Sequence, residues 1–278
     1  MKLSCLPVSL YADFNNGTRT LGDWFRFAHE LGLDGADLSV AHVKSRTPAY
    51  LNDLRQQASD AGVQIMMMAT YSDFTHPDAA ERARQVEDIL QWIEAAQHLG
   101  LSFLRLTAGQ NHPGVERAAG LAWAAEGLMA CQTAAQGSGV TVLYENHTRG
   151  AFWTMNDFTQ PADRFLEVVQ KTSGSNVRLL FDTANCLALN DDPIAVLDQV
   201  KDRVSAVHIA DIRRPGAFEP VVIGTGSSPI PALLRMLVEN GYDGWLSIEE
   251  ASKTGEEGFR QAVAFVDRAW VQAGGKRR

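Results

Sequence analysis

The sequence predicts an α/β protein that folds as a single (β/α)8 TIM barrel. Three observations support this prediction: helices and strands alternate along the 278 residues, eight such units can be counted, and no glycine-rich phosphate loop follows an early strand. Strict alternation makes neighbouring strands parallel, because each helix returns the chain to the same end of the sheet. Eight units then close naturally into one barrel of about 250 residues.

Eight short apolar runs are predicted to be the strands, because they are rich in β-branched, aromatic or aliphatic residues and are too short for helices. They are residues 2–6, 33–40, 63–69, 101–107, 140–145, 177–182, 204–210 and 242–250. Successive side chains of a strand point to opposite faces, so Glu145 shares a face with Leu143, and Asp182 shares one with Leu180.

Eight segments with apolar residues at helical spacing are predicted to be the helices. They are residues 20–31, 48–61, 77–99, 121–136, 157–171, 192–201, 229–239 and 256–270. Glycines such as Gly32 and Gly100 follow several of them, where the end of a helix favours a left-handed residue. We therefore expect residues 1–272 to form one domain, with residues 273–278 as a C-terminal tail.

A doubly wound open sheet is the alternative fold, and it would place a glycine-rich phosphate loop after an early strand. Residues 7–11, which follow the first strand, contain no glycine, and the Gly-Thr-Gly of residues 224–226 comes too late in the chain. The barrel is therefore the preferred prediction.

Composition limits the classes of partner and the cellular compartments that the sequence makes plausible. A net charge of -8 argues against a nucleic-acid partner, which would require a basic face. Three widely spaced cysteines, Cys5, Cys131 and Cys186, form neither a disulfide framework nor a Cys-x-x-Cys motif. No apolar stretch approaches the roughly 18 residues of a membrane span. We expect a cytoplasmic protein without a membrane partner, and a homo-oligomer is an open alternative.

Polar residues end or interrupt the last four predicted strands. Glu145, Asp182, His208 and Glu249 each follow an apolar run, and the C-terminal ends of barrel strands meet at one rim. Each residue alone could be a helix cap or a rim residue, and a register slip of one position would replace Glu249 by Glu250. Together, three carboxylates and an imidazole predict a site for one divalent metal ion, because a cation relieves their repulsion. Mn²⁺ is the expected ion, with Mg²⁺, Co²⁺ or Zn²⁺ as alternatives.

The sequence resembles the xylose isomerase-like TIM-barrel superfamily, and most closely its sugar phosphate isomerase/epimerase branch. The resemblance rests on LYENH around Glu145, FDTAN around Asp182, VHIAD around His208, the Gly-Thr-Gly of residues 224–226, and Gly-Tyr-Asp-Gly before Glu249. It covers nearly the whole chain. The branch includes ketose 3-epimerases, inosose dehydratases, dehydroshikimate dehydratases and enzymes that cleave 3-oxo-glycosides, so the resemblance implies a small carbohydrate substrate.

The resemblance also implies roles for individual residues. Glu145 and Glu249 would bind the metal and move protons, one removing a proton beside a metal-polarised carbonyl and the other returning one to the opposite face. Arg214 could donate hydrogen bonds to substrate oxygens, His147 could contact substrate hydroxyls or orient Glu145, and Trp153 could form an apolar wall. The alternatives are a solvated loop charge for Arg214, a rim position for His147 and core packing for Trp153.

One position departs from the pattern of the family. Ketose epimerases have a histidine three residues after the metal-binding aspartate, where this chain has Asn185. Asparagine can bind a substrate hydroxyl but does not titrate near neutral pH. A metal-dependent lyase or dehydratase is therefore the alternative to an isomerase or epimerase.

A DNA repair nuclease of the endonuclease IV type is a further alternative within the superfamily. Such enzymes hold three metal ions with additional histidines. The third and fourth predicted strands end here in Thr70 and Ala108 instead, and Asn185 removes another histidine. We expect one metal ion and no nuclease activity.

Overall fold

The structure is a computed structural model that describes residues 1–277. Eight parallel strands form one sheet in the order β1-β8-β7-β6-β5-β4-β3-β2, and the two ends of this order meet to nearly close a barrel. The strands are β1 (Lys2–Leu6), β2 (Gly35–Ser39), β3 (Gln64–Ala69), β4 (Phe103–Leu106), β5 (Thr141–Glu145), β6 (Arg178–Asp182), β7 (Val204–Ile209) and β8 (Trp245–Glu249). The predicted (β/α)8 TIM barrel is confirmed.

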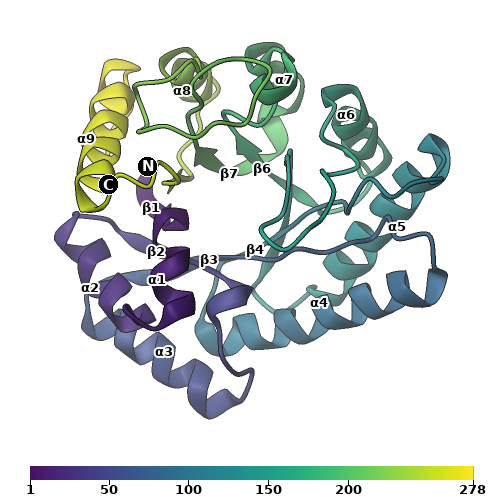
Figure 1. The fold of residues 1–278 in the computed structure, drawn as a ribbon, viewed down its shortest axis with the longest axis horizontal. Coiled ribbons are helices and arrows are strands. Elements are labelled where there is room, and N and C mark those ends of the chain that lie inside the picture. The colour runs from purple at the N-terminus through teal and green to yellow at the C-terminus, as the bar shows by residue number, and fades with distance from the viewer. Residues whose placement is uncertain (278) are drawn as a thin grey trace.

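Helices form a ring around the strands (Figure 1). The α-helices are α1 (Tyr11–Asn16), α2 (Leu21–Glu30), α3 (Pro48–Asp60), α4 (Ala79–Leu99), α5 (Arg117–Ala134), α6 (Ala162–Lys171), α7 (Pro193–Val200), α8 (Ile230–Glu239) and α9 (Glu256–Gln272). Short 3-10 helices are η1 (Val8–Leu10), η2 (Val40–His42), η3 (Leu187–Leu189) and η4 (Lys201–Arg203).

Two helix predictions were wrong in detail. The prediction of eight helices omitted α1, which has six residues and buries none of them, so it lacks the apolar period that marks longer helices. The helix expected at 157–171 begins only at Ala162, after Pro161. The carboxylate of Asp157 accepts hydrogen bonds from the backbone N–H of Thr159 (2.7 Å) and from its hydroxyl (2.8 Å), which stabilises a turn instead of a first helical turn.

The inside of the barrel is filled by a small apolar cluster below the polar strand ends. Its members are Met66, Met67, Leu143, Leu180, Ala206 and Trp245, all almost fully buried. Leu143, Leu180 and Ala206 lie two positions before Glu145, Asp182 and His208, as the alternation of side chains along a strand requires. The apolar layer therefore supports the polar residues at the rim from below.

The chain termini meet at one place on the barrel (Figure 1). Within the expected tail of residues 273–278, the carbonyl oxygen of Lys276 accepts hydrogen bonds from the Met1 amino group (2.6 Å) and from the Trp270 indole (3.2 Å). Arg277 contacts Asp267 at 2.7 Å, and Arg278 lies outside the described residues. Among the described helices, none is both long and apolar enough to cross a membrane.

Candidate metal centre

Four side chains from consecutive strands meet at the C-terminal rim of the barrel. Glu145 ends β5, Asp182 ends β6, His208 lies near the end of β7 and Glu249 ends β8. Each offers one ligand atom, and these four atoms all lie within 4.8 Å of one another. The neighbouring Glu250 is buried elsewhere, and its carboxylate accepts a hydrogen bond from the Ser252 backbone at 2.9 Å.

Hydrogen bonds fix the orientation of three members of this cluster. The imidazole Nδ1 of His208 lies 2.7 Å from Glu145 Oε1 and 3.2 Å from Glu249 Oε2. Asp182 Oδ1 accepts backbone N–H bonds from Ala184 (2.8 Å) and Asn185 (2.7 Å), because the chain turns directly after β6. Asp182 Oδ2 is buried without a hydrogen-bond partner among the described residues, so it is available to a metal ion.

The electrostatics of the cluster favour an added positive charge. Burial raises the pKa of Asp182 well above its ordinary value, and the carboxylates of Glu249 and Glu145 raise it further. Burial alone would lower the pKa of His208, but Glu145 and Glu249 beside it raise that pKa to about 10. The neighbouring carboxylates contribute to both shifts, and a donor set of three carboxylates and one imidazole fits a divalent cation.

Sequence reasoning missed Arg105 on β4, which completes the charge balance of the cluster. Its guanidinium is 3% exposed, lies 3.2 Å from Glu145 Oε2 and donates a hydrogen bond to the carbonyl of Thr70 at 2.7 Å. Burial alone would raise the pKa of Glu145, but Arg105 and then His208 lower it to about 2. The sequence did offer a signal for this residue, because Arg105 is the single charged residue in the apolar run of residues 101–107.

A second missed residue is Asp37, in the middle of β2 and fully buried inside the barrel. Its Oδ2 accepts hydrogen bonds from the hydroxyls of Ser4 (2.9 Å) and Ser247. Burial raises the pKa of Asp37 to about 6. An aspartate near the centre of the predicted strand 33–40 was the available signal, because aspartate is depleted in strands.

A cavity of about 370 Å³ opens beside the cluster, and Glu249 is the cluster member that lines it. Arg105, His147 and Asn185 line the same cavity. The Asn185 amide nitrogen donates to the carbonyl of Asn146 at 2.9 Å, and its Oδ1 is buried with no hydrogen-bond partner among the described residues. His147 Nδ1 lies 3.7 Å from Asp157 Oδ2.

Two other sequence-predicted residues lie outside the lining of this cavity. The Trp153 ring packs edge-on against His147, with ring centroids 5.6 Å apart, and its indole donates to the carbonyl of Tyr71 at 3.4 Å. Arg214 is exposed, and its guanidinium lies 3.6 Å from the carboxylate of Glu219, which does line the cavity. Both residues can influence the cavity only through these neighbours in this structure.

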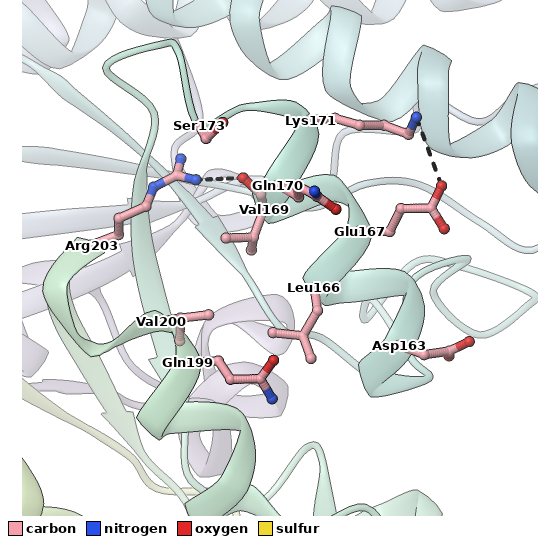
Figure 2. Close-up of a pocket in the computed structure, with 10 residues that line it drawn as sticks. All are labelled: Asp163, Leu166, Glu167, Val169, Gln170, Lys171, Ser173, Gln199, Val200 and Arg203. Carbon is pink, nitrogen blue, oxygen red and sulfur yellow. Dashed lines mark hydrogen bonds and ion pairs between the residues drawn. The ribbon is translucent and has the colours of Figure 1, made fainter.

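A larger hollow of about 930 Å³ lies on the outside of the barrel, between α6 and α7 (Figure 2). Its charged groups are occupied: Lys171 lies 3.7 Å from Glu167, and the Arg203 guanidinium donates to the carbonyl of Val169 at 2.5 Å. None of the four cluster residues lines it. The smaller cavity at the rim is therefore the candidate active site.

Comparison with known proteins agrees with the barrel. Residues 25–269 match a family model described as xylose isomerase-like TIM barrel. The chain is 28% identical over 259 residues to a putative hydroxypyruvate isomerase of Streptomyces coelicolor, covering 88% of each protein. It is 29% identical over 143 residues to an inosose dehydratase of Clostridium beijerinckii, but this match spans 45% of this chain and only 45% of that protein.

Among solved structures, the barrel is similar to that of the IOLI protein with a binding zinc atom. The two share 17% identity with a TM-score of 0.80, over 98% of this chain and 99% of that chain. The crystal structure of D-psicose 3-epimerase in the presence of D-fructose matches with a TM-score of 0.75 at 17% identity, over 97% and 99% of the two chains. At such identities the likeness shows the fold alone.

Proposed function

The chain belongs to the xylose isomerase-like TIM-barrel family, and on that premise we propose that it is a divalent-metal-dependent isomerase or epimerase of a sugar or sugar derivative. The observation that carries the proposal is the meeting of Glu145, Asp182, His208 and Glu249 beside a cavity at the rim. Relatives of the chain are named as isomerases, epimerases and dehydratases, which supports carbonyl chemistry on small molecules.

The four cluster residues are proposed to hold one divalent ion, with Mn²⁺ expected and Mg²⁺, Co²⁺ or Zn²⁺ as alternatives. Such an ion, when bound, polarises a substrate carbonyl and the adjacent hydroxyl and so acidifies the neighbouring C–H bond. Asp182 and His208 would serve as ligands, and both are fully buried.

Glu249 is the proposed acceptor of the substrate proton. Its side chain is 22% exposed and lines the cavity, so a substrate carbon can approach its carboxylate. Glu145 is 1% exposed and is anchored by Arg105 and His208. In an epimerisation, Glu145 would first take up a proton from solvent and would then deliver that proton to the opposite face of the same carbon.

Asn185 and His147 are proposed to bind substrate hydroxyl groups. Both line the cavity, and the free Oδ1 of Asn185 can accept a hydrogen bond from a hydroxyl. Trp153 would support the ring of His147, and Arg214 would act on the cavity through Glu219. These four roles are positional and do not require any of the residues to titrate.

A lyase or dehydratase is the second candidate. The same proton abstraction leads to elimination when the neighbouring carbon carries a leaving group. The inosose dehydratases among the relatives favour this outcome. Asn185 also favours it over simple ketose epimerisation, because it stands where ketose epimerases have a histidine and an amide does not titrate near neutral pH. Under this alternative Glu249 keeps its role and Glu145 has no proton to return.

The experiment that tests the proposal uses the Mn²⁺-loaded protein in deuterated water with ketoses, inososes and 3-oxo-glycosides. Deuterium incorporation with a stereoisomeric product supports an epimerase, and an unsaturated product supports the lyase. Glu145→Gln and Glu249→Gln are expected to abolish turnover while the circular dichroism spectrum is unchanged. Glu167→Gln is the matched control, because it removes a carboxylate on the outside of the barrel, away from both the cavity and the cluster. Full activity in either cluster variant, or nicking of abasic DNA, would contradict the proposal.

A further inference from the structure

Besides Arg105 and Glu249 on the strands, the charged residues that line the rim cavity lie in loops and fall into two sets. The carboxylate of Glu219 is accompanied by the guanidinium groups of Arg213 at 3.4 Å and Arg214 at 3.6 Å. By contrast, Arg149 and Lys253 line the cavity and form no ion pair with any residue between 1 and 277. The lining of the cavity therefore carries two positive charges without a counterion among residues 1–277.

Arg149 is held in place by the loop that carries it. Its Nε and Nη2 both donate to the carbonyl oxygen of Trp153, each at 3.2 Å. The remaining Nη1 amino group has no partner within the described part of the chain. A guanidinium fixed by two of its donors loses little freedom when the third binds a ligand, so the group is pre-organised.

Lys253 is held in a backbone conformation that lysine rarely adopts. It lies in the loop between β8 and α9 with φ of 59°, in the left-handed region. Its backbone N–H donates to the hydroxyl of Ser9 at 2.8 Å, and the N–H of Ser9 donates to the carbonyl of Glu250 at 2.9 Å. Left-handed residues other than glycine persist where surrounding contacts enforce them, and they concentrate at ligand sites.

We propose that the substrate is an anionic sugar derivative whose carboxylate or phosphate group binds between Arg149 and Lys253. This inference rests on the proposed function, because it places the reacting carbonyl of the same molecule beside Glu249. Phe218 and Pro220 add two apolar rings to the lining of the cavity. A cavity of about 370 Å³ suits a small ligand with one charged end.

The test compares three six-carbon ligands of the Mn²⁺-loaded protein by isothermal titration calorimetry: D-fructose, D-fructose 6-phosphate and 2-keto-D-gluconate. At least one anionic ligand is expected to bind about 10-fold or more tightly than fructose, as a charge-assisted hydrogen bond provides. Preference for the phosphate ester identifies a phosphate subsite, and preference for the keto acid identifies a carboxylate subsite. Fructose binding as tightly as both anions, or neither anion binding at millimolar concentration, overturns the proposal.

Variants test whether Lys253 and Arg149 cause the preference for an anionic ligand over fructose. Lys253→Gly removes the ammonium group and suits the left-handed backbone, and Arg149→Met removes the guanidinium. Each is expected to weaken binding of the preferred anion about 10-fold or more and to weaken binding of fructose by much less. Lys253→Arg and Arg149→Lys should restore part of the loss. The matched controls are Lys171→Met and Arg26→Met, which remove exposed cations outside the cavity. Unchanged anion affinity in Lys253→Gly and Arg149→Met overturns the proposal.

Failure of the subsite and failure of the proposed function are distinguishable in these titrations. Ligand binding that persists undiminished in EDTA contradicts the metal-dependent function. Metal-dependent binding without any preference for an anion contradicts only the assignment of Arg149 and Lys253.

Discussion

Replacing Arg105 by methionine tests whether a buried guanidinium keeps Glu145 ionised. The two groups are 3.2 Å apart and at most 3% exposed, so their attraction is about 5 kcal/mol at an effective dielectric constant of about 20. A Glu145 pKa lowered from 4.5 to about 2 corresponds to roughly 3 kcal/mol in favour of the ionised form. Removing one partner of a buried ion pair costs about 3 to 5 kcal/mol. We expect Arg105→Met to lower the free energy of unfolding by that amount at pH 7.

The pH dependence of this loss has a definite sign. Because the pKa of Glu145 is lower in the folded state, its contribution to stability is present above about pH 4.5 and disappears as the pH falls towards 2. In Arg105→Met the buried carboxyl group loses its guanidinium partner, and protonation at low pH removes the uncompensated charge. The difference in stability between wild type and variant should therefore be largest at pH 7 and shrink as the pH is lowered through 4.

The assay is urea unfolding followed by circular dichroism in EDTA, at pH 7 and at pH 4. Arg26→Met is the control, because Arg26 belongs to an exposed pair on α2 and should cost less than about 1 kcal/mol. In a Glu145→Gln background, Arg105→Met should lower the free energy of unfolding much less, because no Glu145 carboxylate remains to lose its partner. A cost below about 1 kcal/mol at pH 7, or an undiminished cost in the Gln background, would refute this electrostatic reasoning.

Three further predictions concern the metal, the barrel interior and a helix contact. Mn²⁺ at 100 times its dissociation constant should stabilise the wild type by about 2.7 kcal/mol in calorimetry, and Asp182→Ala should lose most of this gain. The pKa of Asp37 is raised from 3.8 to about 6, so its stabilising contribution is complete below pH 3.8 and is lost as the pH rises through 6. Urea unfolding in EDTA should therefore find Asp37→Asn more stable than wild type at pH 8, by up to about 3 kcal/mol, and equal to it near pH 3. Gly127→Ala should lower the melting temperature although alanine favours helices, because the added Cβ would lie 2.5 Å from the Phe74 ring. Gly174→Ala is the control and should not lower the melting temperature, because nothing lies within 4 Å of the added Cβ.

The barrel and the meeting of four polar side chains could be predicted from the sequence. Both follow from regular patterns, namely the alternation of helices and strands and the two-residue period of side chains along a strand. Alternating helices and strands require parallel pairing, and parallel strands bring their C-terminal ends to one rim. The two-residue period of a strand then puts Glu145 on the same inward face as the buried Leu143. The roles of these side chains in binding and catalysis stay predictions.

Contacts across the barrel could not be predicted in the same way. Arg105 meets Glu145 and Asp37 meets Ser247 through side chains from different strands, and the exact stagger of those strands is not readable from one sequence. Loop geometry was equally out of reach. Trp153 packs against His147 instead of lining the cavity, because the loop between β5 and α6 turns around Asp157 before the helix begins.

The carboxyl groups of the cluster have different electrostatic environments, which shift their pKa values in opposite directions. Arg105 and His208 lower the pKa of Glu145 to about 2, whereas burial and the neighbouring glutamates raise the pKa of Asp182 well above its ordinary value. When the surroundings of two nearby carboxyl groups push their pKa values apart, one group tends to stay ionised and the other tends to hold a proton. Of these two carboxyl groups, Glu145 is therefore the one that ionises more readily, and protonation is favoured at Asp182. A divalent ion competes with protons for these carboxylates, which makes its binding weaker at low pH. Glu249, which alone of the three carboxylates lines the cavity, remains the proposed acceptor of the substrate proton.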